Sequence, residues 1–179
     1  MLDATQLLTI FKEFSLELQS TNRMESFFIM GGSAFLALQL NDQITLDTDL
    51  AFPKLDPGLK IISKKLSAKF ELPNDWLNNG GQSFANQLPE GWKFRALNFF
   101  NSKHLEVKCL SLKDLLFLKC LAYFDREKTR DLDDIKSLKP NTKDLNDTFK
   151  WMATILEDQE SIKSLKLYFK HLRNLLNEK

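Results

Sequence analysis

The chain has 179 residues and a formal net charge of +1, so its length favours one domain with a small helical lobe appended. The near-neutral charge excludes a protein that binds nucleic acid through its overall charge, and any such binding would need a local patch. Hydrophobic residues make up 43% of the sequence, enough for a real core, but no apolar run reaches the roughly 18 residues of a membrane span.

The first 110 residues alternate between helix and strand patterns. Apolar residues at helical spacing predict a helix over residues 3–19, opened by the capping pair Asp3 and Gln6. The elements expected next are a buried strand over 27–30, a helix over 33–40, a strand over 44–52, a helix over 57–70 with Pro57 in its first turn, a loop over 71–90, and two strands over 93–100 and 103–110.

From Ser111 onward the pattern is helical throughout. Ser111 and Asp114 fit a capping box, and further helices are expected over 131–138, 144–156 and 161–176. The sequence therefore predicts an α/β protein of the α+β kind, in which residues 1–110 form the core and residues 111–179 form a helical C-terminal lobe packed on it.

Cysteine usage and the N-terminus bear on the compartment. Cys109 and Cys120 stand in apolar surroundings without a C-x-x-C pattern, which predicts buried thiols rather than a disulfide or a metal site. The N-terminus lacks the basic start and long apolar run of a signal peptide. We expect a cytoplasmic protein.

The stretch from Met30 to Asp49 has the composition of a phosphate and metal site. Gly31-Gly32-Ser33 follows a short apolar run, and Asp47 and Asp49 come about fifteen residues later. Residues two apart on a strand point the same way, so both carboxylates would reach one spot, where a hard cation such as Mg²⁺ would offset their repulsion. Backbone N–H groups of the glycine turn suit phosphate. The pattern predicts a site for a metal-bound nucleoside triphosphate.

Each part of this pattern also has a purely structural explanation. A D-x-D spacing occurs in polar strand edges and turns, and a glycine pair serves a tight strand-to-helix turn that needs positive φ. Ser33 is suited either to cap the following helix or to bond a phosphate oxygen. The combination of the two segments favours the site.

Three further residues are candidates. Nucleotidyl transfer uses one or two metal ions, so a third carboxylate would complete the site. Glu106, mid-strand between apolar neighbours, is the best candidate, and its alternative is a solvent-facing strand residue. Lys119 and Arg130 are candidates for nucleotide binding, with a solvated helix face and surface ion pairs as alternatives.

The last predicted helix is basic. Over residues 161–179 five cations oppose one acid, Glu178, which gives 5 − 1 = +4. The alternatives are the solvated face of an amphipathic helix and a patch that receives an RNA backbone. The cations are Lys163, Lys166, Lys170, Arg173 and Lys179.

In order and spacing, these motifs resemble the signature of the nucleotidyltransferase superfamily. The resemblance is strongest to a small bacterial branch related to minimal nucleotidyltransferases and to abortive-infection proteins of toxin–antitoxin systems. It covers residues 26–140, including an apolar strand before Ser111. The motifs that carry it are Gly31-Gly32-Ser33, Thr45-Leu46-Asp47-Thr48-Asp49, Leu72-Pro73-Asn74-Asp75-Trp76-Leu77-Asn78, Ser111 to Lys119 (Ser-x-x-Asp-Leu-Leu-x-x-Lys) and Arg130-Asp131-Leu132-Asp133-Asp134-Ile135.

The resemblance implies a nucleotidyltransferase-like mixed sheet flanked by helices. It implies metal binding at the two aspartates, triphosphate contact at Gly32 and Ser33, and a contribution of Lys119 and Arg130 to nucleotide binding or domain packing. The implied activity is Mg²⁺-dependent transfer of a nucleoside monophosphate from an NTP to a hydroxyl. The acceptor would be an RNA, such as tRNA, or a protein side chain, in the setting of a toxin–antitoxin pair.

Two departures from the family pattern favour an alternative. Gln43 stands where the branch has the arginine of an Arg-x-Thr-x-Asp-x-Asp string, and Glu106 is longer than the usual aspartate. The alternative is a catalytically inactive binding module that keeps the fold, as an antitoxin-like or regulatory partner.

Overall fold

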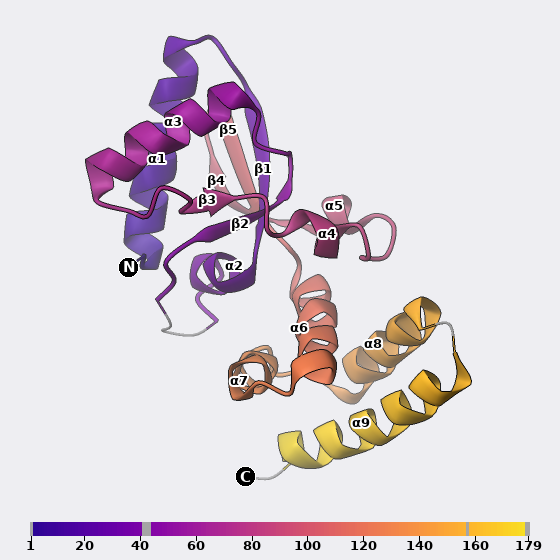
Figure 1. The fold of residues 1–179 in the computed structure, drawn as a ribbon. Coiled ribbons are helices and arrows are strands. Elements are labelled where there is room, and N and C mark those ends of the chain that lie inside the picture. The colour runs from indigo at the N-terminus through magenta and orange to yellow at the C-terminus, as the bar shows by residue number, and fades with distance from the viewer. Residues whose placement is uncertain (1, 41–43, 157, 178–179) are drawn as a thin grey trace. The chain divides into compact units, whose positions relative to one another are not determined.

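The computed structural model describes residues 2–40, 44–156 and 158–177. The chain divides into two compact units. The sheet unit comprises residues 1–86 and 90–111, and the helical unit comprises residues 87–89 and 112–179. Figure 1 shows the elements of both.

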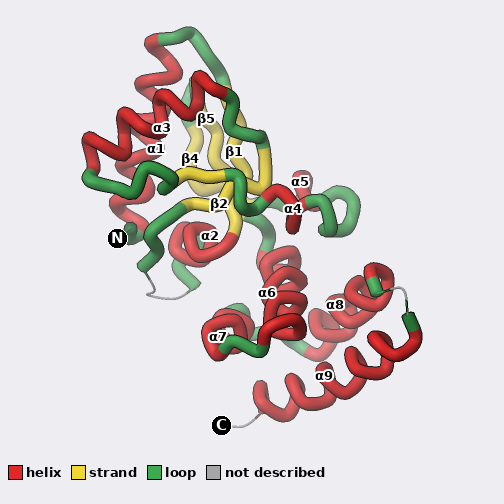
Figure 2. The backbone as a smooth tube through the Cα atoms, viewed as in Figure 1, coloured by secondary structure: helices red, strands yellow, loops and turns green. Residues whose placement is uncertain are grey.

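The sheet unit is built on a five-stranded mixed sheet with the order β3-β2-β1-β5-β4. Figure 2 draws the strands in yellow. β1 lies at its centre, antiparallel to β2 and parallel to β5. β3 is parallel to β2, and β4 is antiparallel to β5. The predicted mixed α and β class is therefore confirmed. The strands are β1 Glu25–Met30, β2 Thr48–Phe52, β3 Leu77–Asn78, β4 Leu97–Asn101 and β5 Leu105–Cys109.

Local sequence explains where the helices of the sheet unit begin. The helices are α1 Ala4–Ser20, α2 Gly31–Ala37, α3 Pro57–Phe70, α4 Gln82–Ala85 and α5 Trp92–Arg95. The predicted capping pair of α1 is confirmed, because Asp3 and Gln6 form a reciprocal capping box. Asp56 caps α3 by accepting from the N–H of Leu59, and Pro57 occupies the first turn as predicted.

One face of the sheet carries an aromatic core. α1 and α3 pack against each other, and α1 places Phe11 and Phe14 against Phe27 of β1, with ring centroids 6.5 and 5.3 Å apart. Trp76 is fully buried, and its ring centroid lies 6.3 Å from that of Phe11. Because side chains alternate along a strand, Phe28 is directed to the opposite face.

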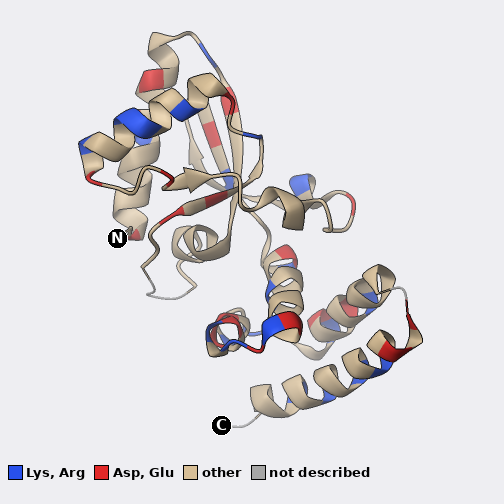
Figure 3. Cartoon of the chain, in the orientation of Figure 1, with Lys and Arg blue, Asp and Glu red and all other residues tan. Residues whose placement is uncertain are grey.

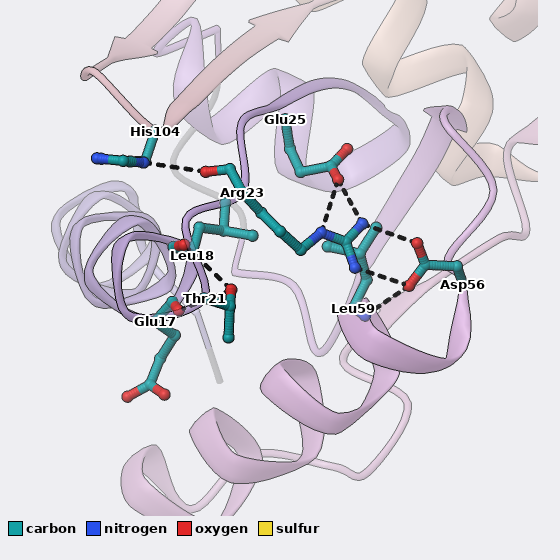
Figure 4. A network of polar contacts seen from close by, with 8 residues as sticks. All are labelled: Glu17, Leu18, Thr21, Arg23, Glu25, Asp56, Leu59 and His104. Atoms are coloured by element: carbon teal, nitrogen blue, oxygen red, sulfur yellow. Dashed lines mark hydrogen bonds and ion pairs between the residues drawn. The ribbon is translucent and has the colours of Figure 1, made fainter.

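An ionic cluster ties the start of β1 to the start of α3 (Figure 4). Arg23 donates hydrogen bonds to Glu25 and to both carboxylate oxygens of Asp56. The Arg23 side chain, together with the N–H of Leu59, lowers the pKa of Asp56 to about 2. The Nδ1 atom of His104, the residue before β5, lies 3.0 Å from the backbone oxygen of Arg23, which precedes β1. This contact links the starts of the two parallel strands.

Three predicted segments of the sheet unit differ in the structure. The strand expected over 44–52 begins only at Thr48, and Thr45 forms an isolated bridge with Leu2 instead. The loop expected over 71–90 contains β3 and α4, because burying Trp76 draws this segment onto the sheet. The strand expected over 93–100 is preceded by the single turn of α5, and its strand part is β4.

The helical unit consists of four helices in the described residues: α6 Leu112–Arg126, α7 Thr129–Ser137, α8 Thr142–Ile155 and α9 Gln159–Asn177. Phe117 stacks on Trp151 with ring centroids 4.9 Å apart, and the indole N–H of Trp151 donates to the backbone oxygen of Gln87. None of the helices in the ranges described is long and apolar enough to cross a membrane.

Both cysteines are buried free thiols, as predicted. Cys109 lies on β5 and Cys120 on α6. Burial raises the pKa of each thiol to about 12, which keeps both protonated and unreactive at neutral pH.

Candidate functional site

The carboxylate of Asp49 lies between two glycine turns. Asp49 pairs with Met30 of β1 on one side and with Asn78 of β3 on the other. Gly31 follows β1 directly, and Gly80 comes two residues after the end of β3. The sheet register therefore brings two turns from distant parts of the sequence to the same aspartate.

The two glycines leave the space that this carboxylate fills. A Cβ atom on Gly31 would lie 2.9 Å from Oδ2 of Asp49, and one on Gly80 would lie 2.8 Å from Oδ1. Gly31 also has φ +63°, in the left-handed region that favours glycine. The expected tight strand-to-helix turn with positive φ is therefore present, and it faces an aspartate of the pair.

The second glycine turn is held in place by asparagine side chains. The N–H of Gly80 donates to Oδ1 of Asn78 at 2.6 Å, and the N–H of Leu55 donates to Oδ1 of Asn79 at 2.9 Å. A Cβ on Gly81 would lie 2.8 Å from the backbone oxygen of Leu50, so this turn packs closely on β2. Sequence reasoning treated the segment as loop and missed its place beside the aspartate. The run of two asparagines and two glycines was the available signal.

Asp47 stands just before β2 and is exposed. The hydroxyl of Thr45 donates to Oδ1 of Asp47 at 3.2 Å. Thr48, between the two aspartates, is fully buried, whereas Asp49 is half-buried. This alternation directs both aspartates away from the core.

Ser33 is used inside its own turn. It is buried, and its hydroxyl donates to the backbone oxygen of Met30 at 2.9 Å. The N-cap residue of α2 is Met30, which makes no side-chain capping hydrogen bond. The Ser33 hydroxyl therefore does not serve as the expected N-cap. Gly31 and Gly32 are both partly exposed at the start of α2.

The structure places Glu106 away from the aspartates. Glu106 is opposite Ser26 on β1, whereas Asp49 is opposite Met30, four residues farther along the same strand. Four residues span about 13 Å of strand, and the two acids lie on opposite sides of β1. Glu106 instead pairs with Lys108 at 3.0 Å and accepts from Ser26, and these contacts lower its pKa.

The carboxylates near this turn suit a metal ion that binds together with substrate phosphates. Among the described residues no group of three His, Cys, Asp or Glu side chains could hold a metal ion. Mg²⁺, however, is commonly bound by one or two carboxylates together with substrate phosphates. Asp47 and Asp49 offer two carboxylates of that kind, both directed away from the core.

In the helical unit, Lys119 belongs to a buried ionic cluster. Its Nζ lies 2.5 Å from Asp134 and 3.4 Å from Asp131, and Arg126 contacts Asp131 at 2.7 and 2.9 Å. The side chain of Asp131 is only 2% exposed. Burial alone would raise the pKa of Asp131, but Arg126 and Lys119 hold it below its usual range.

This cluster explains two of the sequence motifs. The Ser111–Lys119 motif supplies the lysine, and the Arg130–Ile135 motif supplies both aspartates, so the motifs meet in space. Lys119 links α6 to α7 within the helical unit through its ion pairs with Asp131 and Asp134. Arg130 is exposed on α7.

The basic last helix is amphipathic, and its lysines lie on a solvated face. Leu165, Phe169 and Leu172 are buried, and Lys163, Lys166 and Lys170 are exposed. Arg173 contacts Asn146 of α8 at 2.9 Å. Figure 3 shows the lysines and arginines along α9. Glu178 and Lys179, and the departure at Gln43, lie outside the described residues.

Comparison with known protein families found a matching family. The family described as nucleotidyltransferase of unknown function (DUF6036) matches residues 5–172. Comparisons with curated proteins and with solved structures gave no match.

Proposed function

This chain belongs to the DUF6036 family of nucleotidyltransferases, and on that premise we propose that it transfers a nucleoside monophosphate from an NTP to a hydroxyl group. The observation that carries the proposal is the Asp49 carboxylate held between Gly31 and Gly80. Close backbone approach and an acid at one point are what a metal-bound triphosphate requires.

Asp47 and Asp49 would hold Mg²⁺ together with the phosphates. When bound, the ion neutralises the triphosphate and lowers the pKa of the attacking hydroxyl. Gly31 and Gly32 have no side chains, so the triphosphate can approach the backbone N–H groups at the start of α2. Ser33 stabilises this turn through the hydrogen bond that its hydroxyl donates to the backbone oxygen of Met30.

The acceptor in this proposal is a hydroxyl of RNA, tRNA included, or of a protein side chain. A toxin–antitoxin pair is the setting in which the related branch suggests such a transfer. The exposed lysines of α9 supply a positive surface that suits RNA, although the overall charge of the chain is only +1.

A second candidate function is a catalytically inactive binding module. The position of Glu106 favours it, because this acid is engaged by Lys108 and Ser26 and leaves two carboxylates where a third would strengthen metal binding. Such a module would bind NTP without transferring it.

The test compares the wild type with Asp49→Asn. Each protein is incubated with α-labelled NTPs, Mg²⁺ and total RNA, and NTP affinity is measured by calorimetry. We expect label transfer by the wild type and a loss of at least about a hundredfold in Asp49→Asn, as for the removal of one preorganised electrostatic group. The control is Glu90→Gln, an exposed acid of the sheet unit remote from β2 in sequence.

The outcomes separate the two candidates. Transfer that depends on Asp49 but not on Glu90 supports the enzyme. Tight Mg²⁺-dependent NTP binding without transfer supports the binding module. Absence of both NTP binding and transfer in the wild type would refute both.

A further inference from the structure

The face of the sheet opposite α1 carries a row of side chains that crosses four strands. Phe52 of β2 and Lys108 of β5 are both opposite Phe28 of β1, one on each side. Asn98 of β4 is in turn opposite Lys108. Residues opposite each other on neighbouring strands share a face, so these four side chains lie on the face to which Phe28 is directed. The row crosses three strand spacings, or about 14 Å.

Side chains of α5 contact this row. The ring centroid of Trp92 lies 5.4 Å from that of Phe28, and Nζ of Lys93 lies 3.4 Å from the ring centroid of Phe52. The next residue of the turn, Phe94, is 96% exposed, and Phe52 is 43% exposed. Exposed apolar surface rimmed by polar groups is typical of a binding site. We call this surface the aromatic face, and its members are Phe28, Phe52, Trp92, Lys93, Phe94, Asn98 and Lys108.

The cations beside the aromatic rings differ in their partners. Lys108 forms an ion pair with Glu106 at 3.0 Å. Arg95 donates to the backbone oxygen of Glu90, an exposed acid two residues before α5. Lys93 is exposed and forms no ion pair within the described part of the chain. Its ammonium therefore stays available to an anionic group of a ligand, next to rings on which a planar ligand can stack.

The aromatic face is continuous with the candidate site. On β1, Met30 is opposite Asp49 and Phe28 is opposite Phe52. Met30 and Phe28 are two residues apart, so Asp49 and Phe52 share a face and their positions differ by about 7 Å along β1. A ligand on the aromatic face therefore lies next to the carboxylate that the proposed function uses.

We propose that the aromatic face binds a single-stranded RNA. One base stacks on Phe94, and a phosphate pairs with the ammonium of Lys93. The next nucleotide lies along Phe52 toward Asp49. Aromatic rings beside a cation bind single strands in this way, because every base has a π-face. The inference rests on the proposed function for the choice of RNA, since each ribose of RNA carries a 2′-hydroxyl that can serve as acceptor.

Two other occupants fit this surface less well. The single base of an NTP would cover only part of a row about 14 Å long, whereas successive nucleotides of one strand can follow it. A membrane surface favours a continuous apolar face, and here the exposed side chains of Lys93 and Asn98 interrupt it. Both occupants are outcomes of the test below.

The test measures the binding of a short labelled single-stranded RNA of mixed sequence to the full chain by fluorescence anisotropy, without NTP or Mg²⁺. We expect Phe94→Ala and Lys93→Glu each to weaken binding at least about fivefold, and Phe94→Trp to retain it. The matched controls are Ile61→Ala and Lys60→Glu, exposed residues of α3 outside the aromatic face, with an expected change of less than about twofold. Thermal unfolding should be unchanged in Phe94→Ala, because this side chain is almost fully exposed.

Two measurements separate this inference from the proposed function. Asp49→Asn is expected to bind the RNA as the wild type does, even where it loses transfer, because Asp49 is not a member of the aromatic face. Phe94→Ala is expected to keep its NTP affinity in calorimetry and to lose label transfer to RNA. RNA binding by the wild type without any transfer would count against the proposed function alone.

Four results would overturn the inference. The first is a wild type that does not bind the RNA, and the second is unchanged RNA affinity in both Phe94→Ala and Lys93→Glu. The third is tighter binding of single-stranded DNA of the same sequence. The fourth is loss of RNA binding only when the exposed lysines of α9 are replaced, which would place the RNA on that helix. The variant for the fourth result is Lys163→Glu/Lys166→Glu/Lys170→Glu.

The two rival occupants have their own signatures. Loss of NTP affinity in Phe94→Ala with unchanged RNA binding would assign the aromatic face to the base of the NTP. Binding to vesicles that contain an anionic lipid, lost in Phe94→Ala and not accompanied by RNA binding, would assign it to a membrane surface. Either result replaces RNA as the ligand of this face.

Discussion

The two units of this chain treat a pair of aspartates in opposite ways. In the helical unit, Asp131 and Asp134 are buried and neutralised by cations of α6. In the sheet unit, Asp47 is exposed and Asp49 is half-buried beside two glycine turns. The same residue type at similar spacing is buried with cations in one unit and reaches solvent beside glycine turns in the other.

The difference teaches how to separate structural acids from candidate catalytic acids. A buried carboxylate is tolerated only with a cation and hydrogen bonds, so its partners lie within the chain. An acid that binds Mg²⁺ together with substrate phosphates has to be reachable by the substrate. The surroundings of the acid, rather than the spacing of two acids in the sequence, separate the two cases.

The largest effect on stability is expected from Lys119→Met. The substitution leaves Asp134, and in part Asp131, buried without its cation, and we expect the free energy of unfolding to fall by about 3 kcal/mol or more in urea unfolding. The control is Arg130→Met on the exposed side of α7, with an expected change below about 0.5 kcal/mol. Unchanged stability with weakened NTP binding in Lys119→Met would reverse the assignment and make Lys119 a nucleotide ligand.

A smaller effect is expected from Gly31→Ala. The new Cβ meets the Asp49 carboxylate and the positive φ adds strain, so we expect a loss of about 2 kcal/mol in thermal or urea unfolding. Gly91→Ala is the matched control, because Gly91 has φ +78° but its Cβ would meet only Arg95 at 3.5 Å. A loss no larger than that of the control would show that the carboxylate does not confine this turn.

The smallest effect is expected from Asp56→Ala. Loss of the cap on α3, together with loss of the exposed ion pair with Arg23, should cost about 1 kcal/mol at pH 7. Because the pKa of Asp56 is lowered to about 2, its contribution is complete above the ordinary aspartate pKa and is lost as the pH falls through about 2. Unfolding curves of the two proteins should therefore converge between pH 4 and pH 2. A gap that stays constant over that range would exclude the ionised cap as the cause.

Features set by neighbouring residues could be predicted from the sequence. The capping pair Asp3 and Gln6, the proline at the start of α3 and the burial of both cysteines all follow from local pattern, and each is confirmed. The order of mixed helices and strands followed by helices alone could also be predicted, because the periodicity becomes purely helical at Ser111.

Features set by strand register could not be predicted. The expected third acid, Glu106, was chosen because it lies mid-strand, but the register of β5 on β1 places it opposite Ser26 rather than near Met30. The glycine turn at Gly80 was missed because nothing in its own segment shows that β3 pairs with the strand of Asp49.

By itself, the sequence determined the change from mixed helix and strand to helix alone at Ser111, the capping box of α1, the proline at the start of α3 and the buried thiols. Those features depend on residues a few positions apart, and the geometry of a helix or strand fixes which of them share a face. Only the tertiary structure decided that Asp49 meets Gly31 and Gly80 and that Lys119 is neutralised by Asp134. Such contacts depend on the pairing of distant segments, because packing and burial select one register among many that the local pattern permits.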